Sequence, residues 1–426
     1  DSDGDGTYEI ANAGQLYWFA EQVTNGKVSL NAILTADIVV NEGDVAGCNG
    51  TKNASWRDWT PIGDGYYGYK GTFDGQGHTI SGLYFYGECN PDEDQFDGED
   101  VGIVRKLNDS GVIQNVGLEN SYFYGETEVA GICGRNSGGI IRNCYNTATI
   151  TCENIIVGGI VGYSYGTVSN CYNTGNIEGS SNVGGVCGFN DSYSNFLSGS
   201  KTYGTIENCY STGNVTGTQK LGGICGTSAY GDCTVKNCYN TGDITGTKII
   251  GGIIGNNASK IVQNCYNTGT VTGTETDEVG AVCGMDTYTA SQNCYYLSEA
   301  GETDDLDGTT AKTADEFSSG EVAYLLNGST SDDAAVFRQN LDNGQTADAL
   351  PVLDSAHGVV CSGTTCTGVA GYTNDGNMTD AIHIWDEDGF CTRDTTHYQP
   401  AIDSDNDGTY EISSAGQLYW FADKVN

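Results

Sequence analysis

The sequence predicts a chain dominated by β-structure. Its main part is predicted as a right-handed parallel β-helix of about eight coils, with short capping helices and a small C-terminal β-rich segment. The phrase Asn-Cys-Tyr occurs six times at intervals of 27 to 38 residues, and a phrase of the type Val-Gly-Gly-Ile-Cys-Gly precedes it each time. The chain also has 63 Gly but only 4 Pro, which is typical of many short strands joined by tight turns.

Each repeat unit reads as three strands of three to five residues separated by turns. A self-similar period of this length indicates a solenoid or a propeller. A propeller blade needs four strands in roughly 40 to 45 residues, too many for a unit of 27 residues. The leucine-rich frame is absent from the sequence. One coil of a parallel β-helix therefore fits best, with equivalent residues stacked about 4.8 Å apart on successive coils.

The cysteine of each Asn-Cys-Tyr phrase is predicted to point into the narrow bore as a small apolar residue. Val161 and Ile254 replace the cysteine of the upstream phrase, and Val116 stands where a later unit has its Asn-Cys-Tyr cysteine, which favours a packing role. Disulfides between coils are an alternative at that stacking distance, and metal binding is a weaker one because the repeat lacks Cys-x-x-Cys and Cys/His pairs. The ladder cysteines are Cys144, Cys171, Cys209, Cys238, Cys265 and Cys294.

The asparagine before each of these cysteines is predicted to stack its amide in a ladder at a corner of the coil. The paired glycines of the upstream phrase are expected to give corner conformations with positive φ. Two insertions interrupt the repeat, an acidic one at residues 88–100 and a second one at residues 190–203. Protruding loops on a rigid scaffold often bind partners, and the alternative is a neutral surface excursion.

The ends of the solenoid need caps, because open strand edges aggregate. Asn12 is predicted to cap a helix whose Leu16, Phe19 and Val23 fall on one face, and Thr313 to cap a second helix after the last coil. We divide the chain into five parts. They are residues 1–36 (calcium-loop-like turn and capping helix), 37–297 (β-helix), 298–353 (C-terminal cap with helix), 354–402 (small β-rich linker module) and 403–426 (start of the next tandem copy).

Residues 403–426 nearly copy residues 1–24, a period of 402 residues. We interpret the chain as one module of a longer tandem array. Alternatively, the last segment completes the cap of a neighbouring copy.

The phrases "DSDGDG" and "DSDNDG" at the start of these two copies match the first half of an Asp-x-Asp-x-Asp-Gly calcium loop. The bidentate Glu at position 12 of such a loop is missing, since Asn12 and Ser414 stand there. The sequence therefore predicts Ca²⁺ at weaker affinity than a full loop, and an Asp-rich linker turn is the alternative. The predicted ligands are Asp1, Asp3, Asp5 and Glu9 in the first copy, and Asp403, Asp405, Asp407 and Glu411 in the second.

The net charge of −39 argues against nucleic acid and anionic membranes as partners, and it fits a secreted or surface protein. No apolar run approaches the roughly 18 residues of a membrane span. The chain opens on Asp1, so we expect a mature or excised segment whose targeting sequence was removed or lies outside it.

Catalysis finds little support, and we predict that the chain is not an enzyme. The four histidines accompany no Ser or Cys nucleophile in a recognisable frame. Asp74 and His78 are the nearest candidates for a polysaccharide-cleaving site, but they are better explained as part of an early coil. A stretch with Trp56, Trp59, Tyr66, Tyr67 and Tyr69 either stacks on sugars or, as we prefer, plugs the N-terminal end of the solenoid.

The stretch "VGGIVGYSYGTVSNCYNTGNIEG" from Val157 resembles the GLUG repeat family of bacterial cell-surface proteins. The resemblance extends over roughly residues 1–353 and is specific in the six repeated units. It implies an extracellular, often adhesin-like or stalk-like setting and a parallel β-helix, and it transfers no catalytic residues.

We therefore expect a non-catalytic structural module of an extracellular bacterial stalk or filament, whose partners are further copies of itself. The alternatives are an adhesin that binds a glycan or a host protein and, less favoured, a polysaccharide-acting β-helix enzyme.

Overall fold

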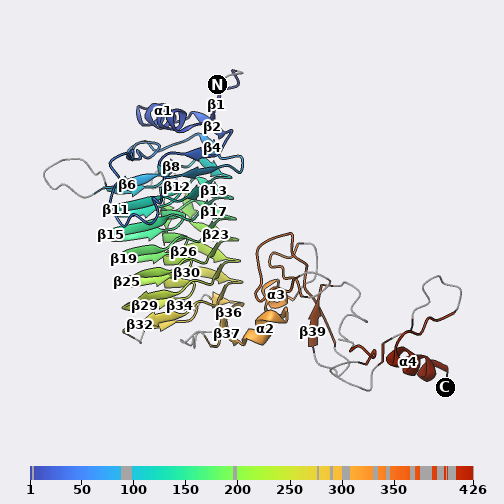
Figure 1. Ribbon diagram of the computed structural model, residues 1–426. Helices are drawn as coiled ribbons and strands as arrows, with labels where there is room; N and C mark the ends of the chain where they lie inside the picture. The colour runs from blue at the N-terminus through green and yellow to red at the C-terminus, as the bar shows by residue number, and fades with distance from the viewer. Residues whose placement is uncertain are drawn as a thin grey trace. The chain divides into compact units, whose positions relative to one another are not determined.

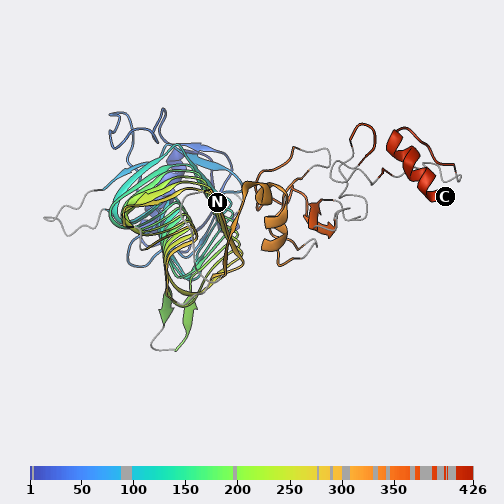
Figure 2. The same cartoon turned by 90° about the horizontal axis from the view of Figure 1, so that it is seen from below.

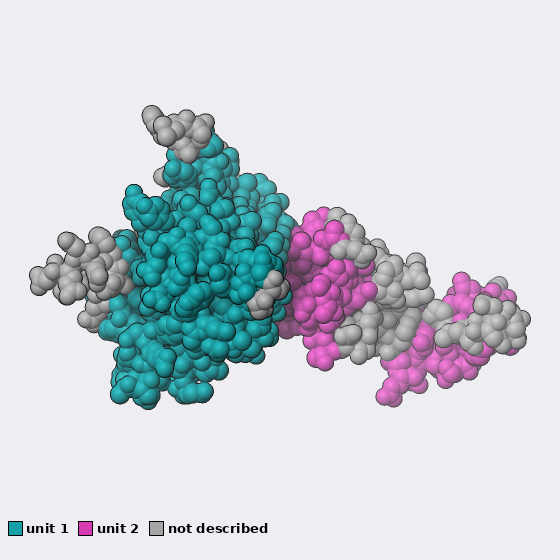
Figure 3. All heavy atoms as spheres, turned by 90° about the horizontal axis from the view of Figure 1, so that it is seen from above, with its two compact units in different colours: residues 1–312 teal, residues 313–426 magenta. Residues whose placement is uncertain are grey.

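A computed structural model describes most of the chain, in two compact units, residues 1–312 and 313–426 (Figure 3). The described residues are 1, 4–87, 98–194, 199–275, 278–287, 291–299, 308–329, 334–341, 346–364, 370–374, 386–390, 398–399, 401 and 409–425.

The first unit is a stack of short strands in three parallel sheets (Figure 1). The 15-stranded sheet A contains β1 (Thr7–Ile10), β2 (Asn31–Leu34), β4 (Thr72–Asp74), β8 (Val104–Asn108), β9 (Val112–Gln114), β12 (Cys133–Ser137), β13 (Ile140–Arg142), β16 (Val161–Ser164), β17 (Thr167–Ser169), β20 (Cys187–Asn190), β23 (Thr205–Glu207), β26 (Cys225–Lys236), β30 (Ile254–Gln263), β34 (Cys283–Asp286) and β35 (Ser291–Gln292).

Sheets B and C have ten strands each. Sheet B contains β3 (Ile38–Val39), β5 (Thr79–Ser81), β10 (Gly117–Glu119), β14 (Tyr145–Asn146), β18 (Tyr172–Asn173), β24 (Tyr210–Ser211), β27 (Tyr239–Asn240), β31 (Tyr266–Asn267), β36 (Cys294–Leu297) and β37 (Thr309–Lys312). Sheet C contains β6 (Tyr84–Tyr86), β7 (Glu99–Val101), β11 (Tyr122–Ala130), β15 (Thr149–Gly158), β19 (Ile177–Gly184), β25 (Val215–Gly222), β28 (Ile244–Gly246), β29 (Lys248–Gly251), β32 (Val271–Gly273) and β33 (Val279–Gly280).

The chain passes through the sheets in turn, so equivalent residues of successive repeat units pair in register. Tyr145 pairs with Tyr172, which pairs with Tyr210. Their rings stack with centroids 4.9 Å apart, the spacing of neighbouring strands. The predicted all-β class and parallel stacking are confirmed. Viewed along the stack, successive coils overlie one another (Figure 2).

The strands of sheet C are longer than the predicted three to five residues. β15 has 10 residues and β19 has 8. They are long because the chain bends at a corner of the coil while its backbone stays paired with the neighbouring strands of sheet C. Within β15, for example, Ile156 has a φ of +68° while Ile155 and Val157 on either side of it stay paired with β19. A repeat unit also has a fourth strand segment, because it contributes two strands to sheet A, for example β12 and β13.

The predicted cysteine ladder lies in the core. All six thiols are at most 1% exposed, and each donates to the backbone oxygen two residues earlier at 3.1–3.4 Å. All six ladder cysteines are free thiols, which favours the packing interpretation over disulfides. A small side chain whose S–H is satisfied locally suits this fully buried position.

The paired glycines do not have the positive φ that the sequence suggested. Gly185 and Gly223, for example, are not among the residues with positive φ. A Cβ on Gly185 would lie 2.1 Å from the carbonyl oxygen of Gly223 on the next coil. These positions therefore require glycine because successive backbones approach too closely for a side chain. Asparagine has the left-handed conformation at one corner of most coils, and residues of several types have it at a second corner.

The helix α1 (Ala13–Thr24) covers the N-terminal end of the stack. The strands β1 and β2 flank it and belong to sheet A, and β37 extends sheet B to Lys312. The sheets therefore continue on both sides of the predicted β-helix span, residues 37–297.

The second unit contains three helices and a hairpin among its described residues. Thr313 and Glu316 form the predicted capping box of α2 (Ala314–Ser318), and α3 (Glu321–Leu326) follows it. The antiparallel pair β38 (Cys361–Thr364) and β39 (Ala370–Thr373) and the helix α4 (Ala415–Val425) complete the unit. None of the helices in the described part of the chain is long and apolar enough to cross a membrane.

Candidate functional site

A ladder of asparagine side chains follows one corner of the solenoid. Each amide Nδ2 donates to the Oδ1 of the asparagine one coil nearer the N-terminus, at 2.9–3.3 Å. The φ angles lie between 52° and 54°, a left-handed conformation that asparagine tolerates. The predicted amide ladder is thereby confirmed. It consists of Asn115, Asn143, Asn170, Asn208, Asn237, Asn264 and Asn293.

Asp74 ends this ladder. Its carboxylate accepts hydrogen bonds from the Nδ2 of Asn115, from the Nε2 of Gln114, and from the backbone N–H and the Nε2 of Gln76, all at 2.7–2.9 Å. Burial raises the pKa of Asp74, but these four bonds together outweigh burial and hold the pKa below its usual value. His78 pairs with Asp37 at 3.1 Å. The two candidates that the sequence offered for sugar chemistry thus have separate structural partners.

A cluster around Glu128 was not predicted. Glu128 lies at a second left-handed corner with a φ of +56°, and its carboxylate contacts the guanidinium of Arg135 at 2.9 Å. That guanidinium lies over the ring of Tyr163, whose hydroxyl donates to Asp191. Burial and the neighbouring carboxyl group of Asp100 raise the pKa of Glu128 to about 9, although Arg135 opposes them. The equivalent positions of the following units hold Ile156, Asn182, Lys220 and Ile249, so no single recurring residue revealed this corner.

We expect Glu128→Gln to flatten the dependence of stability on pH. The folded state keeps a proton on Glu128 up to a pH of about 9, whereas an unfolded chain loses it near 4.5, the usual pKa of a glutamic acid side chain. Stability therefore falls as the pH rises from 4.5 to about 9. The variant should gain stability over the parent at the upper end of this window and change little at the lower end. Melting temperatures of the variant and the parent, measured across this pH window, test the prediction. Melting temperatures that depend on pH in the same way in both proteins would contradict it.

The predicted calcium ligands lie only partly within the described residues. Asp1 accepts from the backbone N–H of Gly6 at 3.3 Å, and the terminal amino group contacts Glu9 at 3.2 Å. Asp5 accepts from the N–H of Thr7, and Glu411 is exposed. Among the described residues, no three acidic, His or Cys side chains form a group that could hold a metal ion. Calcium remains a prediction. Asp3, Asp403, Asp405 and Asp407 lie outside the described residues.

The aromatic stretch divides into two parts. Trp59 and Tyr69 are at most 2% exposed, and they donate hydrogen bonds to the backbone oxygens of Gly102 and Leu30. These two rings plug the solenoid, as we preferred. Tyr66 and Tyr67 are instead 81% and 58% exposed, with their rings 4.8 Å apart.

The insertion at residues 190–203 forms a hairpin rather than an irregular loop. The strands β21 (Ser192–Ser194) and β22 (Lys201–Tyr203) pair antiparallel and project from the stack (Figure 2). Tyr193 on β21 is 47% exposed and stacks on Tyr165 of the scaffold at 5.2 Å. The acidic insertion lies outside the described residues, except for residues 98–100.

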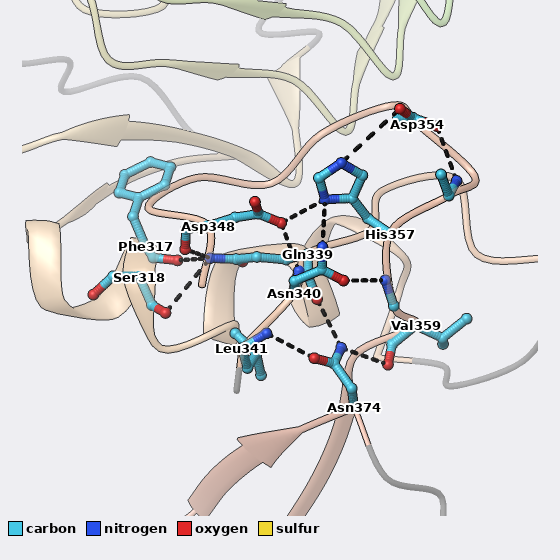
Figure 4. Close-up of polar contacts among 12 residues, drawn as sticks. Phe317, Ser318, Gln339, Asn340, Leu341, Asp348, Asp354, His357, Val359 and Asn374 are labelled. Carbon is cyan, nitrogen blue, oxygen red and sulfur yellow. Dashed lines mark hydrogen bonds and ion pairs between the residues drawn. The ribbon is translucent and has the colours of Figure 1, made fainter. Parts of the chain in front are cut away.

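A polar network in the second unit joins its loops to its helices (Figure 4). The buried Gln339 donates from its Nε2 to the backbone oxygens of Phe317 and Asp348, both at 2.9 Å. The Nδ1 of His357 lies 2.6 Å from the Oδ2 of Asp348, and Asn374 donates to the backbone oxygen of Gln339. Because most of these bonds end on the main chain, we interpret the network as structural.

The helix α1 begins at the predicted N-cap. The side chain of Asn12 accepts from the N–H of Gln15, and its predicted apolar face, with Ala20 added, is fully buried. The ring of Phe19 packs against Tyr69 and Phe73 of the first coils, with centroids 6.2 and 6.1 Å apart. The helix therefore closes the end of the hydrophobic core.

The helix α4 has nearly the same sequence as α1, but its apolar residues are not buried. Residues 403–426 match residues 1–24 at 18 of 24 positions. The start of the helix is also built alike, since the side chain of Gln417 accepts from the N–H of Ser413 at 2.7 Å, as that of Gln15 accepts from Ala11. Yet Leu418, Phe421 and Val425, the counterparts of the buried face, are 56%, 36% and 69% exposed. These exposed residues form the apolar face of α4.

Four segments of the solenoid match the GLUG motif: residues 125–151, 153–178, 179–216 and 217–245. The chain therefore contains GLUG motifs, and the resemblance that the repeated phrases indicated is confirmed. Further units with the same register flank the matched ones, since β28 pairs with β32, and β11 with β6.

The chain is 32% identical over 171 residues to Halomucin of Haloquadratum walsbyi. That alignment covers 37% of this chain but only 2% of Halomucin. Among solved structures, the chain is similar to one described as a "putative immunoglobulin A1 protease" from Bacteroides ovatus, with a TM-score of 0.47 and 19% identity. The match covers 82% of this chain and 92% of that one.

Proposed function

We propose that this GLUG-motif chain is a non-catalytic structural module of an extracellular bacterial stalk or filament, in which solenoids follow one another as tandem or end-to-end copies. Its sheets close into a right-handed β-helix of about eight coils. Its side-chain ladders and continuous core make the solenoid stiff. This suits a spacer that holds other parts of a protein away from a cell surface.

One observation carries the proposal, namely the apolar face of α4. Fully burying a Leu, Phe or Val side chain is worth about 1.5–3 kcal/mol, and α1 realises this gain on the first coils. A contiguous exposed apolar face usually marks a surface that another element covers. The same sequence in α4 therefore supports its use as the cap of a further solenoid.

Calcium fits the same junction in the proposal. An Asp-rich sequence precedes the capping helix in both copies, so bound Ca²⁺ would stiffen the passage from one module to the next. The net charge of −39 makes such neutralisation favourable. Asp1 and Asp5 precede β1 in the sequence, and Glu9 lies within it, shortly before α1.

Electron microscopy of the native material, with and without a calcium chelator, tests this function. We expect regular fibres with one repeat per module, and we expect the chelator to break them at the junctions. Isolated short rods that the chelator leaves unchanged would contradict the stalk.

Adhesion is the second candidate, and the exposed rings of Tyr66 and Tyr67 favour it. Their loop is held rigidly, since the Asp64 carboxylate accepts from the N–H of Tyr67 and Asn108 donates to its carbonyl oxygen. A rigid aromatic pair of this kind stacks on sugar rings or packs into a host protein at low entropic cost. If electron microscopy shows isolated rods instead of fibres, adhesion becomes the leading function.

A further inference from the structure

The first turns of the two capping helices have different surroundings. In α4, Gly416 is buried, and its N–H donates to the carbonyl oxygen of Asp388 at 2.7 Å. A Cβ on Gly416 would lie 1.8 Å from the carbonyl oxygen of Gly389. Glycine is therefore required there, because the backbone at 386–390 rests directly on the helix. We call residues 386–390 and 398–399 the linker segment.

The linker segment also packs against an aromatic ring of α4. The ring of Tyr419 lies 5.7 Å from that of Phe390 and 5.3 Å from that of Tyr398. The segment is itself ordered by backbone bonds, since Gln399 donates to Gly389, and Phe390 forms a β-bridge with Tyr398. The first turn of α4 thus packs against the linker segment, although the apolar face of α4 is exposed.

The helix α1 shows the reverse arrangement. Its apolar face is covered, but its first turn is exposed, and a Cβ on Gly14 would meet only the Oδ1 of Asn12, at 3.3 Å. Glycine in a helix costs about 0.5–1 kcal/mol relative to alanine. Within the described residues, no close backbone contact requires glycine at position 14, the counterpart of Gly416.

A hollow of about 540 Å³ lies along this side of α1. It is lined by Gly14, Tyr17, Trp18, Glu21 and Arg57, among others. Gly14 and Tyr17 are the counterparts of the two residues of α4 that the linker segment contacts.

The hollow contains one basic side chain, that of Arg57, beside the acidic Glu21. The guanidinium of Arg57 forms no ion pair with the described residues, in a chain with only 17 basic residues. The exposed run Asp386, Glu387 and Asp388 of the linker segment carries the opposite charge.

We propose that this hollow is the binding site for the linker segment of a second copy of this chain. The inference rests on the proposed function and names the contact that joins two modules. The capping helix is shared: its first turn binds the linker segment of one module, and its apolar face covers the solenoid of the next. Of these two contacts, α1 makes the one with the solenoid in this structure, and α4 makes the one with the linker segment. When two modules are joined, the N–H of Gly14 donates to the carbonyl oxygen of Asp388 of the second copy.

Self-association of the full chain tests the site. In the parent, α4 occupies the linker segment, so we expect a monomer. Gly416→Ala places a methyl group against Gly389 and frees the segment, so α1 of another copy can bind it. Sedimentation velocity should then show head-to-tail association that rises with concentration. Adding Gly14→Ala should abolish it. The matched control is Gly65→Ala, since a Cβ on Gly65 would meet open space and Gly65 does not line the hollow.

Persistent association of the Gly416→Ala/Gly14→Ala variant, with the solenoid melting as in the parent, would overturn the proposal. If Gly416→Ala stays monomeric, a chain of residues 1–402 followed by residues 1–426 decides the matter, because linkage raises the effective concentration to the millimolar range. We expect the amide hydrogen of Gly14 in its second module to exchange as slowly as that of Gly416. Exchange as fast as that of Gly14 in the single module would overturn the site.

The two proposals can fail separately. Native fibres that still form with Gly14→Ala would remove the hollow as the junction and leave the stalk function standing. A protected Gly14 in the two-module chain, together with native material that forms no fibres, would keep the contact and remove the stalk.

Discussion

The substitution Gly185→Ala is expected to disrupt the stacked fold. The added Cβ would lie 2.1 Å from the carbonyl oxygen of Gly223 and 2.4 Å from the Oγ of Ser211. The carbonyl belongs to the backbone of the next coil, so it cannot turn away as a flexible side chain would. We expect a cost of more than about 4 kcal/mol, a large part of the 5–15 kcal/mol that typically stabilises a folded domain.

Thermal and denaturant unfolding measure this loss. The control is Gly65→Ala, whose Cβ would meet open space, and its stability should change by no more than about 0.5 kcal/mol. A Gly185→Ala variant that melts like this control would show that the coils separate at little cost, which contradicts the close stacking seen here.

The sequence showed which residues recur in this fold more reliably than it showed the structural role of each. The recurrence of Asn-Cys-Tyr predicted a buried thiol and a corner amide, and both are present. The paired glycines were given the wrong role, because the distance from Gly185 to the next coil depends on a residue 38 positions away. The length of β15 was also missed, since a corner residue such as Ile156 does not look like part of a strand.

The candidate site was predictable where the sequence repeats itself. The similarity of residues 403–426 to residues 1–24 pointed to a junction, and the contrast between α1 and α4 supports it. The hollow beside Gly14 was not predictable, because it arises from residues far apart, such as Tyr17 and Arg57. The cluster of Glu128 was missed for a similar reason: Arg135 and Asp100 reach it from neighbouring strands.

The substitution Asn208→Ala is expected to break the corner ladder in its middle. The amide of Asn208 donates to Asn170 at 3.1 Å and accepts from Asn237 at 2.9 Å. Each of these bonds contributes about 0.5–1.5 kcal/mol. Alanine would also have to hold a φ of +54°, which asparagine tolerates better. We expect a total loss of about 2–4 kcal/mol in the free energy of unfolding.

Asn208→Gly separates these two causes. Glycine accepts the left-handed φ without strain but makes neither side-chain bond, so its loss in chemical denaturation should be about 1–2 kcal/mol smaller than that of alanine. Equal losses in the two variants would mean that backbone strain contributes nothing. A glycine variant as stable as the parent would mean that the amide ladder does not stabilise the solenoid. We expect the parent to be more stable than the glycine variant, and the glycine variant more stable than the alanine variant. In that case the ladder holds the corner through its hydrogen bonds, and every amide donates toward the carboxylate of Asp74. Because aligned hydrogen bonds polarise one another, a break at Asn208 is also expected to weaken the contacts on both sides of it.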